Sequence, residues 1–256
     1  APLPAAWTGK VWAMHQGIAA ATSSKAPDYL LLTDADIGYA PEMLRSLVMS
    51  SRANGRAMTS VMAKLKCESW AERALVPAFI FFFQMLYPFR WVNSKTASTA
   101  AAAGGCMLVD RGALERAGGI AAIRGALIDD CALGKLLKKQ GPIWLGLSNG
   151  VISLRIYPAF DDIRRMVARS AYAQLHYSPF LLLGTVLGMG LIYLAPLAFA
   201  LFSDYPANVI AGAAYALMVI AFQPTLRFYN RSPLWGLALP VIATAYVGFT
   251  LSLIHI

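Results

Sequence analysis

The stretch YLLLTDADIGYAP, Tyr29 to Pro41, joins a short apolar run to two aspartates one residue apart. The apolar run is too short to cross a bilayer and ends abruptly in polar residues, so it predicts a buried β-strand ending near Thr33. Pro41 stands where proline is favoured in the first turn of a helix, and the apolar residues after it recur at helical spacing. The stretch therefore predicts a strand, a polar turn and a helix in succession.

Further strands and helices are predicted on either side of this stretch. Strands are expected in RAMTSVMAKL, AAAAGGCMLVD, PIWLGL and VISLRIY, and helices over residues 8–22 and in IDDCALGKLLKKQG. A strand, a helix and a second strand joined by short connections are typical of a mainly parallel sheet covered by helices. We therefore predict an α/β domain over residues 1–160.

The composition indicates that another part of the chain lies in lipid. Hydrophobic residues make up 58% of the chain and charged residues 14%, whereas about a quarter of a soluble domain is charged. Beyond Phe180 the only charged residues are Asp204, Arg227 and Arg231. Three apolar runs in this region are long enough to span a bilayer, at about residues 180–202, 208–223 and 234–256.

The arginines predict the orientation of these spans. The loop between the first two spans has one acid and no base, whereas the loop between the second and third has two arginines. An amphipathic, Arg-rich segment at 161–179 precedes the first span. Because positive charge marks the cytoplasmic side, residues 1–160 are expected to face the cytoplasm.

The apolar segment Leu75–Phe89 leaves two interpretations open. It contains about fifteen residues interrupted by Pro77 and Gln84, short of the roughly twenty needed to cross a bilayer. It is either a helix lying in the membrane interface or a helix of the core.

Several kinds of site are not expected. The net charge of +9 could suggest nucleic acid, but Arg155, Arg164, Arg165 and Arg169 crowd just before the first span. Basic residues there meet anionic lipid, and no basic and aromatic pattern indicates nucleic acid. Three cysteines and three histidines are scattered, without the spacing of a zinc site or of a Cys/His nucleophile.

Two pairs of carboxylates are candidates for chemistry. Asp34 and Asp36 follow a strand, where open α/β sheets bind ligands, and together they could hold Mg²⁺ or Mn²⁺ with a diphosphate. A polar turn is the alternative. Asp129 and Asp130 begin a helix, where a general base could sit, but acids there also simply stabilise the helix N-terminus.

The order of the motifs WTGK, TDADI, AGGCML and IDDCALG, followed by an Arg-rich stretch and apolar spans, resembles the family 2 glycosyltransferases, which have the GT-A fold. The longer strings AERALVPAFIFFFQMLYPFRWVN, AAAAGGCMLV, ALIDDCALG and MVARSAYAQLHYSP resemble the hopene-associated subfamily of bacterial hopanoid biosynthesis. The likeness covers essentially the whole chain. It implies a membrane-bound, inverting transfer of a sugar from a nucleotide-sugar donor to a lipid, with a hopanoid as the suspected acceptor, at the bacterial inner membrane.

The resemblance also implies roles for individual residues. Asp34 and Asp36 would bind the divalent cation and the donor diphosphate, and Asp130, with Asp129 beside it, would deprotonate the acceptor hydroxyl. The acceptor side would be lined by Gly104, Gly105 and Cys106.

Three basic residues are further candidates for the diphosphate. Lys10 would either neutralise phosphate or remain a solvated lysine. The Gln-x-x-Arg-Trp motif of processive relatives is missing. Arg165 and Arg169 stand nearest to its place, on one helix face, where they would hold the leaving diphosphate or contact lipid headgroups.

The N-terminal part of the sequence differs from the family pattern. A GT-A domain begins with a strand and a helix that make the first nucleotide contacts, and these are not recognisable before Ala1. We therefore expect a fragment that lacks the N-terminal strand or strands, and the end of the C-terminal region, and that is inactive by itself. The alternative functions are a processive polysaccharide synthase and a non-enzymatic membrane scaffold or transporter piece.

Overall fold

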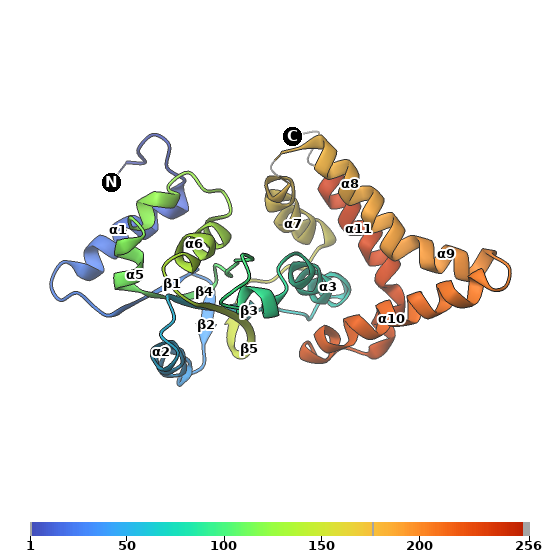
Figure 1. Cartoon of the computed structure of the whole chain (residues 1–256), viewed down its shortest axis with the longest axis horizontal. Coiled ribbons are helices and arrows are strands. Elements are labelled where there is room, and N and C mark those ends of the chain that lie inside the picture. Colours follow the sequence, from blue (N-terminus) through green and yellow to red (C-terminus); the bar gives the residue numbers. More distant parts are fainter. Residues whose placement is uncertain (1, 176, 253–256) are drawn as a thin grey trace. The chain divides into compact units, whose positions relative to one another are not determined.

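The protein forms two compact units (Figure 1). A computed structural model describes residues 2–175 and 177–252. The first unit comprises Ala1–Lys66 and Gln84–Arg155, and the second comprises Cys67–Phe83 and Ile156–Ile256. Each unit is thus assembled from stretches that are separated in the sequence.

The first unit is built on a five-stranded mixed sheet. Its strands, in the order β1-β4-β3-β5-β2, are β1 (Tyr29–Thr33), β4 (Cys106–Asp110), β3 (Met58–Lys64), β5 (Ile143–Ser153) and β2 (Ile37–Tyr39). In this described sheet β3 and β5 pair parallel, whereas β1 with β4, β3 with β4, and β2 with β5 pair antiparallel. The α/β class is confirmed, but the prediction of a mainly parallel sheet is corrected to a mixed one.

The physical reason for this correction is the placement of β4. β1 and β3 are both antiparallel to β4, so they run in the same direction, as a strand–helix–strand unit should. The chain returns after a long excursion to insert β4 between them in the opposite direction. The two strands expected at residues 142–157 are one strand, β5, with an irregular register opposite Met62 and Lys64.

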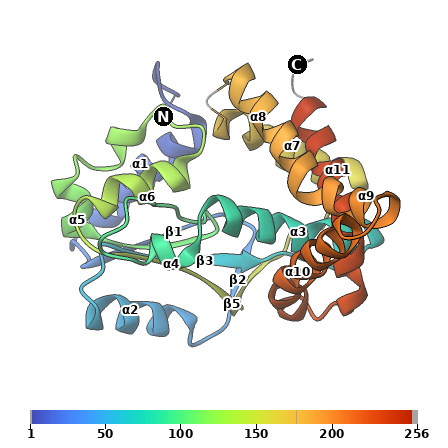
Figure 2. The ribbon, with the colours of Figure 1, turned by 45° about the vertical axis from the view of Figure 1, so that its right-hand side comes forward.

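Helices cover both faces of this sheet (Figures 1 and 2). α1 (Gly9–Thr22), α5 (Arg111–Arg116) and α6 (Asp129–Lys138) lie on one face, and α2 (Met43–Ala53) lies on the other. Leu47 of α2 is buried against Val61, Cys106, Leu108 and Val151. Burying a leucine of this kind contributes about 2 kcal/mol. The remaining short helices of this unit are α4 (Phe89–Val92) and η1 (Ile120–Ile123).

Close packing fixes the position of α6. Leu133 and Leu137 are fully buried, and Lys138 Nζ donates hydrogen bonds to the carbonyl oxygens of Trp91 and Val92 at 3.1 and 2.8 Å. These contacts hold the middle and the C-terminal end of α6, and thereby fix the direction in which its first turn lies.

A methyl group at Gly134 should weaken this packing. A Cβ there would lie 2.9 Å from the backbone carbon of Ala101, so Gly134→Ala is expected to lower stability by about 1–3 kcal/mol, although alanine favours helices. Gly17→Ala in α1 is the matched control, because a Cβ there meets nothing within 4 Å. Thermal unfolding in detergent measures both, and equal melting temperatures would contradict the close approach.

The second unit contains the long apolar helices. α8, η2 and α9 form one run over Pro179–Phe202, α10 forms a second over Ala207–Phe228, and η3 with α11 forms a third over Pro233–Leu251. All three are long and apolar enough to cross a membrane. Residues 253–256 of the third predicted span lie outside the described residues. The separate bounds are α8 Pro179–Met189, η2 Gly190–Leu194, α9 Ala195–Phe202, α10 Ala207–Phe228, η3 Pro233–Ala238 and α11 Leu239–Leu251.

Two further helices belong wholly or mainly to this unit, α3 (Trp70–Leu86) and α7 (Phe160–Gln174). In α3, Leu75 is buried and its carbonyl oxygen accepts a hydrogen bond of 2.9 Å from the Tyr246 hydroxyl. The Phe82 ring lies 4.9 Å from that of Tyr246 and 5.6 Å from that of Tyr193. The first part of the apolar segment 75–89 is therefore buried among the apolar helices.

Candidate active site

A single lysine joins acids from distant parts of the chain in the first unit. Asp34 follows β1, Asp129 begins α6, and Lys10 lies in the first turn of α1. Lys10 Nζ lies 3.0 Å from Asp34 Oδ1 and 3.2 Å from Asp129 Oδ2. The carboxylate after β1 and the pair of acids on α6 therefore meet around one ammonium group.

The second acid of α6 is held by the backbone of the glycine pair. Asp130 Oδ2 accepts a hydrogen bond of 2.9 Å from the Gly104 amide, and its Oδ1 accepts one of 2.7 Å from the Cys131 amide. A Cβ at Gly104 would lie 2.9 Å from Lys10 Nζ and 3.4 Å from Asp130 Oδ2. A side chain at this position would therefore have to displace the end of the flexible Lys10 side chain from its place beside the acids.

Burial and charge set the proton affinity of these groups. The pKa of Asp130 is raised, first because burial disfavours the charged carboxylate and then because Asp129 is a like charge beside it. For Lys10, burial acts to lower the pKa, but the carboxylates of Asp129 and Asp34 outweigh it, so the pKa is raised. Lys10 therefore stays charged, and Asp130 is a stronger base than an ordinary aspartate.

Three residues that the sequence did not single out hold the glycine turn in place. The hydroxyl of buried Ser60 accepts a hydrogen bond of 2.9 Å from the Ala103 amide. Thr33 Oγ1 donates one of 2.9 Å to the Gly105 carbonyl, and the Tyr39 hydroxyl lies 2.7 Å from that Oγ1. Gly104 is thus fixed from both sides. Thr33 is part of the TDAD motif and Tyr39 follows it closely, whereas no sequence signal marks Ser60.

The sequence comparison fits this arrangement. The chain matches the profile of glycosyl transferase family 21 over residues 4–245. It belongs to glycosyl transferase family 21. The search of curated proteins found no match. The prediction of a glycosyltransferase is therefore confirmed, whereas family 2 and the hopene-associated subfamily remain predictions.

The structure of this family 21 protein does not bring every predicted residue to the site. Cys106 is fully buried in the core on the α2 side of the sheet, and burial raises the pKa of its thiol. The Cys106 side chain thus points into the core, and a place for this residue on the acceptor side stays a prediction. Gly105 lies beside Gly104. For Asp36, the backbone carbonyl oxygen accepts a hydrogen bond of 2.8 Å from the Leu154 amide, and a role for its carboxylate stays a prediction.

The predicted arginines belong to the second unit. Arg165 lies on α7, and its guanidinium forms an ion pair of 2.6 Å with Asp161. Arg169 is also on α7, but its side chain is outside the described residues. Their contact with a diphosphate stays a prediction.

The residues of the site fit a divalent cation. The Lys10 ammonium already places a positive charge 3.0 Å from Asp34 Oδ1 and 3.2 Å from the buried Asp129 Oδ2. No group of three or more His, Cys, Asp or Glu side chains in the described part of the chain could hold a metal alone. Carboxylates that hold Mg²⁺ usually share it with substrate phosphates and water, so one or two are enough.

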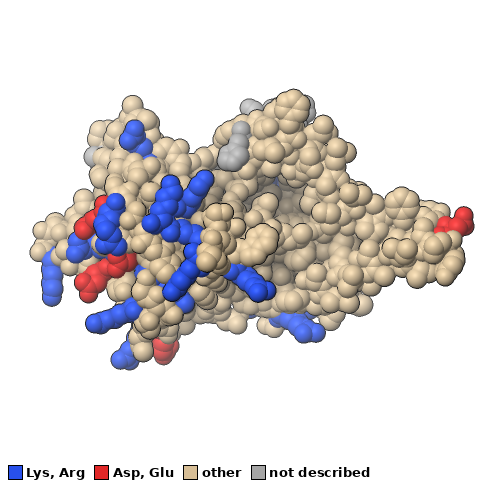
Figure 3. Space-filling view, in the orientation of Figure 1, with Lys and Arg blue, Asp and Glu red and all other residues tan. Residues whose placement is uncertain are grey.

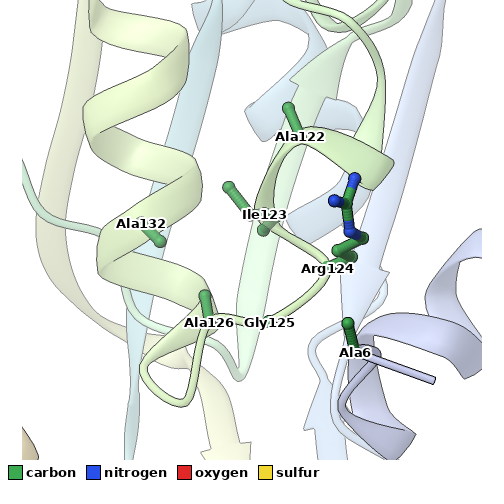
Figure 4. A pocket seen from close by; sticks show the side chains of 7 residues that line it. All are labelled: Ala6, Ala122, Ile123, Arg124, Gly125, Ala126 and Ala132. Carbon is green, nitrogen blue, oxygen red and sulfur yellow. The ribbon is translucent and has the colours of Figure 1, made fainter.

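A separate cavity of about 540 Å³ lies away from these acids (Figure 4). It is lined by Ala6 before α1, by residues 122–126 and by Ala132 of α6. None of the carboxylates or the lysine of the site lines this cavity, so we assign it no part in the chemistry.

Positive charge is concentrated on the unit that contains the site. The first unit has 16 of the 22 Lys and Arg residues but 8 of the 13 Asp and Glu residues. Figure 3 shows these basic side chains gathered over the first unit, while the apolar helices are almost free of charge. Such an excess attracts anionic ligands of the diphosphate class.

Proposed function

We propose that this family 21 chain is a membrane-bound, inverting glycosyltransferase that moves a sugar from a nucleotide-sugar donor to a lipid acceptor. The observation that supports this most is the convergence of Asp34 and Asp129 on Lys10, with Asp130 held beside them by the Gly104 amide. This arrangement offers groups for a diphosphate on one side and a base on the other.

In the proposed reaction each residue has a distinct task. Asp34 and Asp36 position the donor diphosphate, and Lys10 adds a positive charge to it. A divalent cation bound there would offset the negative charge that develops on the leaving diphosphate. Asp130 accepts the proton of the acceptor hydroxyl.

The bonds then change in one displacement. The acceptor oxygen forms a bond to the anomeric carbon as the bond from that carbon to the diphosphate oxygen breaks. The proton passes to Asp130 and the electron pair leaves with the nucleoside diphosphate. Because attack and departure occur on opposite faces, the anomeric configuration is inverted.

The apolar helices support a lipid acceptor. Three helices long enough to cross a membrane would keep the site near the bilayer surface, where a lipid hydroxyl is met. We propose a hopanoid, on the resemblance of the long motifs to the hopene-associated family 2 subfamily. The arginines around the spans support an orientation with the catalytic unit in the cytoplasm, and the resemblance suggests the bacterial inner membrane.

Transfer to extracted lipids tests this function. Membranes containing the full-length enzyme are incubated with radiolabelled nucleotide sugars and with lipid extracts that contain or lack hopanoids. We expect label in the organic phase, as a lipid with a single sugar, when hopanoid is present. Long water-soluble glycans would instead indicate a polysaccharide synthase, and no transfer with any donor would indicate a non-enzymatic membrane protein.

A further inference from the structure

We propose that Lys10 is an exchangeable counter-ion: it neutralises Asp34 and Asp129 when the donor is absent, and it must leave Asp34 before a divalent cation can bind there. This inference rests on the proposed function in one respect, namely that Asp34 meets the cation that accompanies the donor diphosphate. It assigns Lys10 a second role besides contact with phosphate.

The geometry places the ammonium group where it blocks Asp34. Lys10 Nζ lies 3.0 Å from Asp34 Oδ1, and a cation bound to the same oxygen would lie within about 2 to 2.5 Å of it. Two positive charges so close would repel strongly, because the Coulomb energy rises as the distance falls. The lysine and the cation therefore compete for Asp34.

The solvent exposure of the two ion pairs of Lys10 shows which of them can break more easily. The side chains of Lys10 and Asp34 are 44% and 39% exposed, whereas that of Asp129 is 11% exposed. Water screens the pair with Asp34 and can replace it at little cost, while the pair with buried Asp129 is held more firmly. Lys10 can thus release Asp34 and remain on Asp129.

The nature of the arriving ligand decides whether this release is favourable. A cation alone displaces Lys10 from Asp34 and leaves the ammonium group with one carboxylate. A cation that arrives with a diphosphate also brings phosphate oxygens, which give Lys10 a new anionic partner. Lys10 therefore disfavours the bare cation and favours the cation–diphosphate complex, which would couple cation binding to donor binding.

Binding of manganese to two Lys10 variants tests this proposal. Lys10→Met removes the charge and keeps much of the side-chain volume, and Lys10→Gln serves if the first variant does not fold. Lys25→Met, at an exposed lysine in the loop after α1, is the control for the loss of one positive charge. Binding of Mn²⁺ alone is measured on the purified chain in detergent by electron paramagnetic resonance, and binding of Mn²⁺-pyrophosphate by calorimetry.

The expected effects have opposite signs. Both Lys10 variants should bind Mn²⁺ alone about fivefold more tightly than the wild type and Mn²⁺-pyrophosphate about fivefold more weakly, and Lys25→Met should change neither. If both affinities fall, Lys10 only maintains the structure of the site. If Mn²⁺ binding is unchanged and only pyrophosphate binding falls, Lys10 is a phosphate contact alone. Either result overturns the proposal.

Two outcomes distinguish a failure of this proposal from a failure of the proposed function. If Mn²⁺ binds equally to wild type and variants, the counter-ion role is wrong while the assignment of Asp34 to a cation stands. If Mn²⁺ binds to none of them, with or without pyrophosphate, both the counter-ion role and the cation-assisted reaction are wrong.

Discussion

Replacing Asp130 with asparagine should lower the rate of sugar transfer about a thousandfold while the affinity for the nucleotide sugar stays unchanged. A positioned general base contributes about a hundredfold to ten-thousandfold. The amide of asparagine can still accept the hydrogen bond that Gly104 donates to Asp130, but it cannot take the proton of the acceptor. Initial rates at saturating donor, together with the donor dissociation constant, measure the two effects separately.

The control for this substitution is Asp28→Asn, which changes an exposed aspartate in the loop before β1 and should leave the rate unchanged. The pH profile gives an independent check. Because the pKa of Asp130 is raised by burial and by Asp129, wild-type activity should be lost as the pH falls through a value above the ordinary aspartate pKa of about 3.9. Asp130→Asn should lose this acid limb, and a variant that retains full activity would remove Asp130 from the role of base.

Replacing Asp34 with asparagine should reduce transfer about a hundredfold and raise the concentration of Mg²⁺ or Mn²⁺ needed for half-maximal rate. The neutral amide is a weaker ligand for a hard cation, and Lys10 loses the partner that lies 3.0 Å away. Titrating the metal at fixed donor concentration, for wild type and variant, separates the lost metal affinity from a lower maximal rate.

Glu42→Gln is the matched control for Asp34→Asn, because it also neutralises an exposed acid in the first unit, next to the N-terminus of α2. It should leave the metal titration unchanged. If Asp34→Asn shows the same metal dependence as the wild type, Asp34 does not hold the cation and the assignment of the TDAD motif is wrong.

The elements of the first unit could be predicted because their signals are local. The apolar run before Asp34 predicts β1, and the Asp129–Asp130 pair with the lysines that follow predicts α6. Strand partners are not local. Nothing in the CMLVD segment shows that β4 runs between β1 and β3 in the opposite direction, since that depends on how the chain returns from the second unit.

The acidic residues of the candidate site could be predicted from the sequence, but their arrangement in space could not. The TDAD spacing and the helix-starting aspartates are visible in the sequence, and the family resemblance links them. The sequence did not show that Lys10 pairs with both Asp34 and Asp129. A lysine next to a glycine is equally compatible with an ion pair and with a side chain exposed to solvent. The resemblance implied the acceptor side for Cys106, and it did not show that strand alternation turns this side chain into the core.

The anomeric configuration of the product is the most direct measure of whether Asp34, Lys10 and Asp130 act together in one displacement. Product lipid made from a donor of known configuration is examined by NMR, using the coupling constant of the anomeric proton. An inverted linkage, formed by the wild type and absent with Asp130→Asn, is the expected result. A retained linkage would contradict the proposed single displacement and the role of Asp130 as its base.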